Sequence, residues 1–180
     1  AEAKLLVALM QQFPGEEVRF TSSTHDGKKA IVFVHGDTDP GAFYLYDAAA
    51  KKLGFLLARR PWIKPERMAS MQPVDMKARD GTELHGYLTR PPGMDTARKL
   101  PLVVYVHGGP YGIRDHWQFD PTVQALASRG YAVLQVNYRG SGGYGDKFVR
   151  AGLREWGGKM QDDVTDATRW AVAQGIADPA

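Results

Sequence analysis

The chain has 180 residues, of which 43% are hydrophobic and 24% charged, values typical of a globular protein that can bury a core. It contains no cysteine, which excludes disulfide frameworks and thiolate metal sites and leaves the redox compartment open. The formal net charge of +3 comes from basic residues scattered along the sequence, a pattern typical of a solvated surface rather than of a nucleic-acid-binding patch.

The first 60 residues predict a short helix and then four strands. Leu5, Leu6, Leu9 and Met10 recur at the spacing of one helical face, and this segment lacks the basic start and cleavage site of a signal peptide. No apolar run approaches the ~18 residues of a membrane helix. Strands are expected at residues 16–23, 30–36, 42–47 and 52–60. Four short strands at even spacing are typical of one blade of a β-propeller.

Three prolines, Pro61, Pro65 and Pro73, follow these strands and predict a linker or crossover. We therefore place a domain boundary near residue 67. Residues 1–66 form the β-rich part and its linker, and residues 67–180 form a second domain.

The second domain is predicted to be α/β. Residues 73–92 form a hairpin around a turn at Asp80 and Gly81, and the apolar run 102–109 suits a central strand covered on both faces. Further along the chain, the pattern predicts a helix at 121–129, a strand at 131–138 and a helix at 160–174. Strands that alternate with helices indicate a parallel sheet with crossovers.

The sequence His107-Gly108-Gly109-Pro110 ends the run 102–109. Ligands of open α/β sheets bind at the carboxyl ends of strands. Two glycines there let a substrate approach and leave backbone N–H groups free to stabilise an oxyanion, as the glycine-rich turn of α/β-hydrolases does. The alternative is a tight turn that needs glycine for its backbone alone.

A second glycine-rich stretch, residues 137–145, follows the next strand. Gly140, Gly142 and Gly145 match the dinucleotide-binding pattern G-x-G-x-x-G, but Asp162 and Asp163, at the distance of the expected ribose-binding acid, fall on a predicted helix. The alternative to a dinucleotide site is a structural loop that braces the site, with Arg139 in an ion pair.

Metal and cofactor sites are not expected. Asp162, Asp163 and Asp166 could bind a metal, but acids in the first turns of a helix usually face solvent and the helix dipole. The histidines show no metal-ligand spacing; they are His25, His35, His85, His107 and His116.

A nucleophile elbow, G-x-S-x-G, is absent from the sequence. Ser141 alone lies among glycines, and Arg139 occupies the place of the first glycine of the motif. The sequence therefore shows no serine in a strand-to-helix elbow.

Taken together, HGGP, LASRGYAVLQVNYRGSGGYG and EWGGKMQDDVTDATRW resemble the prolyl oligopeptidase family of serine peptidases, nearest its acylaminoacyl-peptidase and dipeptidyl-peptidase-like branch. DTDPGAFYLYD and ARDGTELHGYLTRPPG resemble the end of its propeller and the start of its hydrolase domain. The resemblance implies the first half of an α/β-hydrolase sheet, truncated before the nucleophile elbow and preceded by a propeller blade.

The resemblance also implies a function, the cleavage of short peptides by acyl transfer. The Gly109 N–H would be an oxyanion-hole donor, with His107 and Gly108 supporting it. His107 stands where dipeptidyl-peptidase relatives carry a tyrosine whose hydroxyl reaches the oxyanion. Since the family places its Ser, Asp and His after the last helix seen here, the chain alone is expected to be inactive.

Other interpretations stay open at this point. The parent could be an esterase of the same fold, or the chain could be a non-catalytic interaction module or a truncated pseudoenzyme. Without a following strand, the apolar run 102–109 would form an exposed sheet edge, so self-association is expected.

Overall fold

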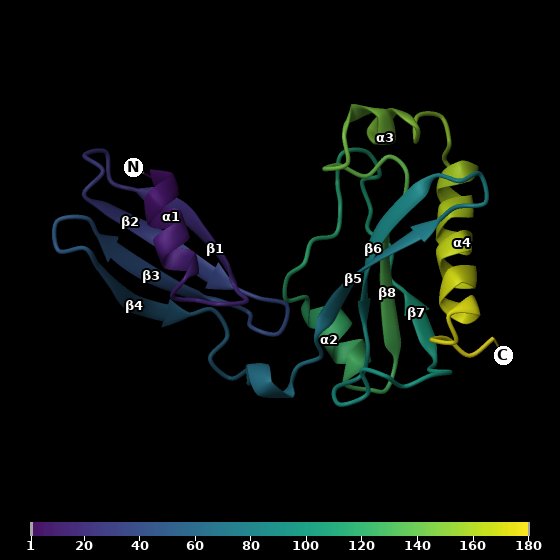
Figure 1. The fold of residues 1–180 in the computed structure, drawn as a ribbon, viewed down its shortest axis with the longest axis horizontal. Coiled ribbons are helices and arrows are strands. Elements are labelled where there is room, and N and C mark those ends of the chain that lie inside the picture. Colours follow the sequence, from purple (N-terminus) through teal and green to yellow (C-terminus); the bar gives the residue numbers. More distant parts are fainter. Residues whose placement is uncertain (1, 180) are drawn as a thin grey trace. The chain divides into compact units, whose positions relative to one another are not determined.

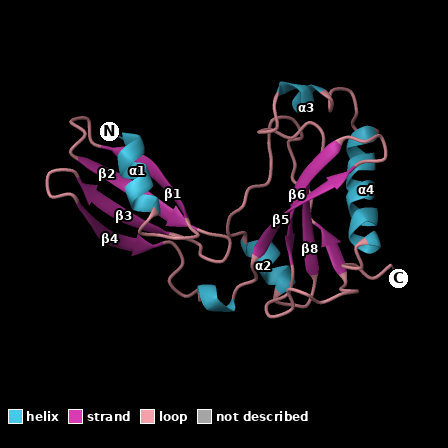
Figure 2. Ribbon diagram, in the orientation of Figure 1, coloured by secondary structure: helices cyan, strands magenta, loops and turns pink. Residues whose placement is uncertain are grey.

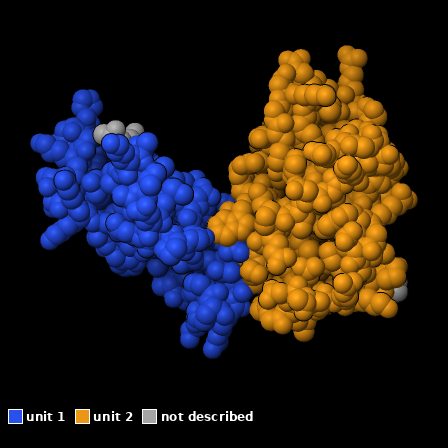
Figure 3. All heavy atoms as spheres, viewed as in Figure 1, with its two compact units in different colours: residues 1–68, 118–120 blue, residues 69–117, 121–180 orange. Residues whose placement is uncertain are grey.

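The computed structural model describes residues 2–179. The chain divides into two compact units, residues 1–68 with 118–120 and residues 69–117 with 121–180 (Figure 3). Strands in Figure 2 gather into two sheets, one in each unit. Among the described residues, no helix is both long and apolar enough to cross a membrane.

The first unit is an antiparallel sheet with one helix packed on it (Figure 1). Leu9 of the helix joins Val18, Val32 and Val34 of the sheet in a buried cluster. The predicted helix and the four predicted strands are all present, each within two residues of its expected bounds. The elements are α1 (Glu2–Met10), β1 (Glu17–Ser23), β2 (Lys29–His35), β3 (Ala42–Asp47) and β4 (Lys52–Ala58), and the short 3-10 helix η1 (Pro65–Arg67) follows them.

The second unit is a mixed sheet of strand order β5-β6-β8-β7. The predicted hairpin pairs antiparallel around Gly81, which adopts a left-handed φ of +83°. The β6–β8 pair is also antiparallel, so the predicted parallel arrangement holds only for β7 and β8. The elements are β5 (Met71–Lys77), β6 (Glu83–Thr89), β7 (Leu102–Val104), α2 (Pro121–Ala127), β8 (Ala132–Asn137), α3 (Asp146–Arg150) and α4 (Lys159–Ala173).

The core of the second unit lies between the sheet and α4. Every residue of β8 is buried, and Ala167 and Ala171 of α4 pack on a cluster that includes Leu84, Leu134 and Val136. Small alanines on the helix let it approach the sheet closely. Gly86 likewise lets β6 approach β8 closely within the sheet, because a Cβ there would collide with the Gln135 carbonyl oxygen of β8.

One prediction for this sheet is wrong. The run 102–109 is not one long strand, because β7 spans only Leu102–Val104. β7 lies at the edge of the described sheet, where this run is expected when no strand follows it. The Tyr105 N–H still donates to the Leu134 carbonyl at 2.9 Å, and then the chain leaves the ladder. Just before β7, a parallel bridge joins Leu100 to Ala177.

The prediction that the acids of α4 face solvent is also wrong for two of them. Asp163 is completely buried, and the Arg139 Nε and Nη2 atoms donate to its two oxygens at 2.8 and 2.7 Å. The same guanidinium binds both oxygens of Asp80, at 2.8 and 3.1 Å. One buried arginine therefore connects the end of β8, the start of α4 and the β5–β6 turn.

A second arginine repeats this arrangement nearer the surface. The Arg79 guanidinium contacts Asp166, which is buried, and Asp162, which is partly exposed. Asp166 also accepts the Arg79 backbone N–H at 2.7 Å. The acids of α4 thus fasten the helix to the β5–β6 turn through Arg79 and Arg139.

Replacing Arg139 should destabilise the second unit strongly. Arg139→Met leaves the buried Asp163 carboxylate without its partner, a change that typically costs about 3–5 kcal/mol of unfolding free energy. Urea unfolding followed by circular dichroism measures this loss. Arg150→Ala is the control, because Arg150 and Asp146 form an exposed i,i+4 pair on α3 that is worth about 0.5 kcal/mol. A loss below about 1 kcal/mol for Arg139→Met would contradict the buried geometry.

Acid should remove part of this stability. The Arg139 side chain holds the pKa of Asp80 well below its ordinary value of 3.8. A lowered folded-state pKa gives stability that is present above the ordinary value and is lost as pH falls through the folded-state value. Asp80→Asn should therefore reduce the unfolding free energy at neutral pH, and the difference from wild type should shrink progressively below about pH 4. A difference that stays constant down to about pH 2 would refute this assignment.

Candidate functional site

The turn at residues 107–110 begins three residues after β7 ends. Gly109 has a φ of +133°, which side chains rarely permit, and a Cβ there would lie 2.9 Å from Ile113 Cγ1. The position therefore requires glycine. Gly108 does not, because a Cβ at this residue would meet open space. Within residues 2–179, no group accepts a hydrogen bond from the Gly109 N–H.

The His107 side chain folds back onto its own turn. Its Nδ1 lies 2.9 Å from the Gly108 carbonyl oxygen, and its Nε2 lies 2.9 Å from Ser141 Oγ. The imidazole stacks on the Tyr138 ring with centroids 4.6 Å apart. The Tyr138 hydroxyl donates to the His107 carbonyl oxygen at 2.9 Å, so side chain and backbone of His107 are both held.

Ser141 is completely buried, which rules it out as a nucleophile that a substrate could reach. In the sequence it stands out only as a serine among glycines. The structure gives it a different place, beneath the turn and in contact with His107.

The second glycine-rich stretch packs against the first. The Gly112 N–H donates to the Gly140 carbonyl at 2.9 Å, and the Gly142 N–H donates to the Ile113 carbonyl at 3.0 Å. A Cβ on Gly142 would collide with the Gly112 carbonyl oxygen. These glycines therefore brace the turn, as the interpretation of residues 137–145 as a structural loop predicted. The dinucleotide interpretation loses its support, because Asp163 is taken up by Arg139.

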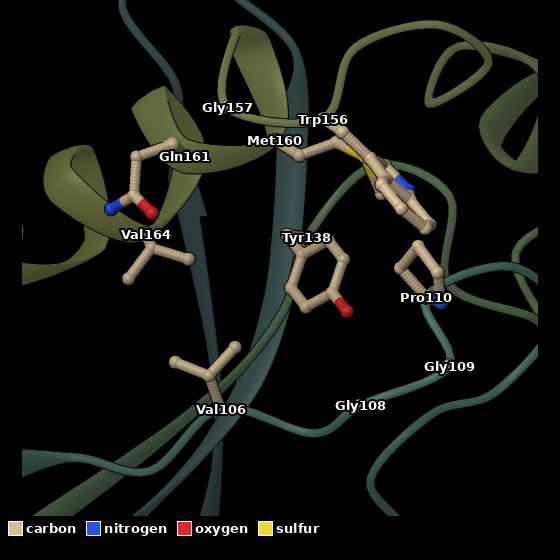
Figure 4. A pocket seen from close by; sticks show the side chains of 10 residues that line it. All are labelled: Val106, Gly108, Gly109, Pro110, Tyr138, Trp156, Gly157, Met160, Gln161 and Val164. Atoms are coloured by element: carbon tan, nitrogen blue, oxygen red, sulfur yellow. The ribbon is translucent and has the colours of Figure 1, made fainter.

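A pocket of about 370 Å³ opens beside the turn (Figure 4). Gly108, Gly109 and Pro110 form one side of it. The Tyr138 ring, which follows the end of β8, and the Trp156 indole, from the loop before α4, also line it. Among the described residues, those that line it include no charged side chain. The remaining lining residues are Val106, Gly157, Met160, Gln161 and Val164.

The aromatic residues give this pocket its character. Trp156 is 70% exposed and stacks with Tyr111, with ring centroids 6.3 Å apart. Burial raises the pKa of the Tyr138 hydroxyl, and the carboxylate of Asp115 adds to the effect, so Tyr138 stays a hydrogen-bond donor at neutral pH. Sequence reasoning missed both Tyr138 and Trp156, because only the fold brings them to the turn.

The histidines do not gather. His85 contacts Asp75 on the β5–β6 hairpin, His35 is buried in β2 and His25 is exposed in a turn. Burial lowers the pKa of His35. No cluster of three or more His, Asp or Glu side chains fit for a metal occurs in the part of the chain that the structure describes.

Comparisons with known proteins match this geometry to a family. The model of the prolyl oligopeptidase family matches residues 117–180. Dipeptidyl aminopeptidase BIII of Pseudoxanthomonas mexicana is 41% identical, over 91% of this chain and 24% of that protein. Dipeptidyl peptidase family member 6 of Caenorhabditis elegans is 34% identical, over 94% of this chain and 25% of that protein. A solved puromycin-hydrolyzing peptidase of Mycobacterium tuberculosis superposes with a TM-score of 0.74 at 27% identity, covering 85% of this chain and 24% of that one.

The chain thus spans about a quarter of the length of the relatives it matches. Sequence and fold agree, since the protein that superposes is a peptidase, as the matched relatives are. The comparisons therefore confirm the resemblance read from the sequence: residues 117–180 match the prolyl oligopeptidase family, and most of the chain is similar to peptidases.

Proposed function

We propose that this chain is part of a serine-type peptidase that hydrolyses short peptides by acyl transfer, and that the Gly109 N–H is one of its oxyanion donors. The observation that carries the proposal is the free N–H of Gly109, held at the mouth of an uncharged pocket by a braced turn. Peptidase names among the relatives support the substrate class.

The chemistry follows from what a tetrahedral intermediate needs. When a serine attacks a peptide carbonyl, negative charge develops on the carbonyl oxygen, and an N–H that already points at that position stabilises it without reorganisation. Gly109 would supply one such N–H, with His107 and Gly108 as the supporting residues of the turn. The nucleophile, acid and base would come from a part of the protein outside these 180 residues.

We further propose the domain assignment that the sequence predicted. Residues 1–66 would form a terminal propeller blade and its linker, and residues 67–180 the first part of an α/β-hydrolase domain. Phe55, Leu56 and Leu57 of β4 support the first assignment, because all three are about half exposed or more, as in a blade with a face left to cover.

The turn proposal predicts that Gly109→Ala, whose Cβ the turn cannot accept, displaces the backbone N–H from the oxyanion. The variant should lower kcat of the full-length protein on an aminoacyl anilide about 100- to 1,000-fold, the usual effect of losing an oxyanion-hole hydrogen bond. Gly93→Ala is the matched control, since Gly93 also has a positive φ, +74°, but lies in an exposed loop with open space around it. Equal kcat values for the two variants would overturn the role of Gly109.

The same assay separates the rival functions. The 180-residue chain alone should show no turnover, whereas the full-length protein should hydrolyse anilides and be blocked by a serine-directed inhibitor. Faster turnover of p-nitrophenyl esters than of anilides, relative to their intrinsic reactivities, would favour an esterase. A full-length protein inactive on both would favour a non-catalytic module.

We also propose that the chain associates with itself through β7. This strand borders the described sheet, and an open strand edge pairs readily with another chain. Light scattering of the purified chain should show a mass above the 19.9 kDa of one copy, and Val106→Lys, at an exposed position just past β7, should shift it toward the single-copy mass. A purely monomeric wild type would refute this proposal.

A further inference from the structure

We propose that His107 is a positioning residue: its imidazole, anchored on Ser141, sets the direction in which the Gly109 N–H points. This inference rests on the proposed function for its catalytic consequence. Its structural part concerns the turn alone.

The two contacts of the His107 ring fix which of its nitrogens carries the proton. The Gly108 carbonyl oxygen can only accept, so the 2.9 Å contact requires the proton on His107 Nδ1. In the uncharged imidazole, Nε2 then carries no proton and accepts the hydroxyl proton of Ser141, 2.9 Å away. A protonated ring would keep the Nδ1 bond and donate from Nε2 to the same hydroxyl oxygen. Either charge state therefore holds the Gly108 carbonyl.

The peptide unit between Gly108 and Gly109 links this contact to the direction of the Gly109 N–H. The Gly108 carbonyl and the Gly109 N–H belong to one trans peptide plane, in which C=O and N–H point in opposite directions. When His107 binds the carbonyl, the N–H must point away from the imidazole. Because glycines on both sides leave this plane free to rotate, the histidine bond is what selects one orientation.

The His107 ring is itself anchored by Ser141 and Tyr138. Ser141 is completely buried and the Tyr138 ring stacks on the imidazole at an interplanar angle of 15°. Tyr138 also holds the His107 carbonyl. The imidazole is thus held on one face by Tyr138 and at its Nε2 edge by Ser141. A ring held in this way can fix the direction of the Gly109 N–H.

The structural arm of the test is NMR of the chain with labelled histidine and glycine. The Nδ1–H form of His107 is expected, and an Nε2–H form would overturn the proposal. Residual dipolar couplings of the Gly109 N–H should change in His107→Phe, which keeps the stacked ring but no nitrogen. They should be largely retained in His107→Asn, whose amide can replace the Nδ1 donor. His85→Phe, which removes another histidine stacked on a tyrosine, is the control and should leave them unchanged.

The kinetic arm uses the full-length protein. His107→Phe and Ser141→Ala should lower kcat about tenfold to a hundredfold with KM nearly unchanged, since the misdirected N–H matters in the transition state. Affinity for a peptide aldehyde should fall by the same factor, and His107→Asn should recover most of the loss. Equal losses in His107→Asn and His107→Phe would overturn positioning, whereas a wild type without peptidase activity would overturn the proposed function and leave the NMR arm to decide the turn.

Discussion

The second unit depends on a single buried guanidinium. Arg139 is 4% exposed and binds the carboxylates of Asp163 and Asp80 with two hydrogen bonds to each. A charge buried without such partners would cost several kcal/mol, so the three elements that bring them must assemble together. The backbone N–H of Arg139 also donates to Asp163, which ties the loop after β8 directly to the start of α4. This loop is the one on which the candidate site is built.

Hydrogen bonds connect this loop after β8 to the turn at residues 107–110 and hold the turn in place. Tyr138 and Ser141 stand on either side of Arg139 in sequence, and both reach His107, one through its carbonyl and one through its ring. Two backbone bonds between the glycine-rich stretches add to this. In the proposed function, the Gly109 N–H is directed by groups that are themselves held, which is the condition for electrostatic preorganisation.

The elements of this fold were largely readable from the sequence. Strands showed alternation or apolar runs, and Gly81 and Gly175 lie where a left-handed residue is needed at a turn and a helix end. The elements that were misjudged or missed have local reasons. The run 102–109 looks like a strand throughout because apolar content does not show where a chain leaves the ladder, and the helix α3 is too short to produce a periodic signal.

By itself the sequence determined which residues could make the chemistry: the glycines of the turn, the absence of a serine elbow and the spacing of motifs that identifies the family. Those are properties of order along the chain. Only the tertiary structure decided what Ser141, Asp163 and His107 do, because each is held by a partner at least 24 residues away in the sequence. A sequence does not show whether a serine or an aspartate is exposed or buried. Burial beside His107 makes Ser141 a support of the turn, and burial beside Arg139 makes Asp163 the residue that holds α4 to the loop after β8.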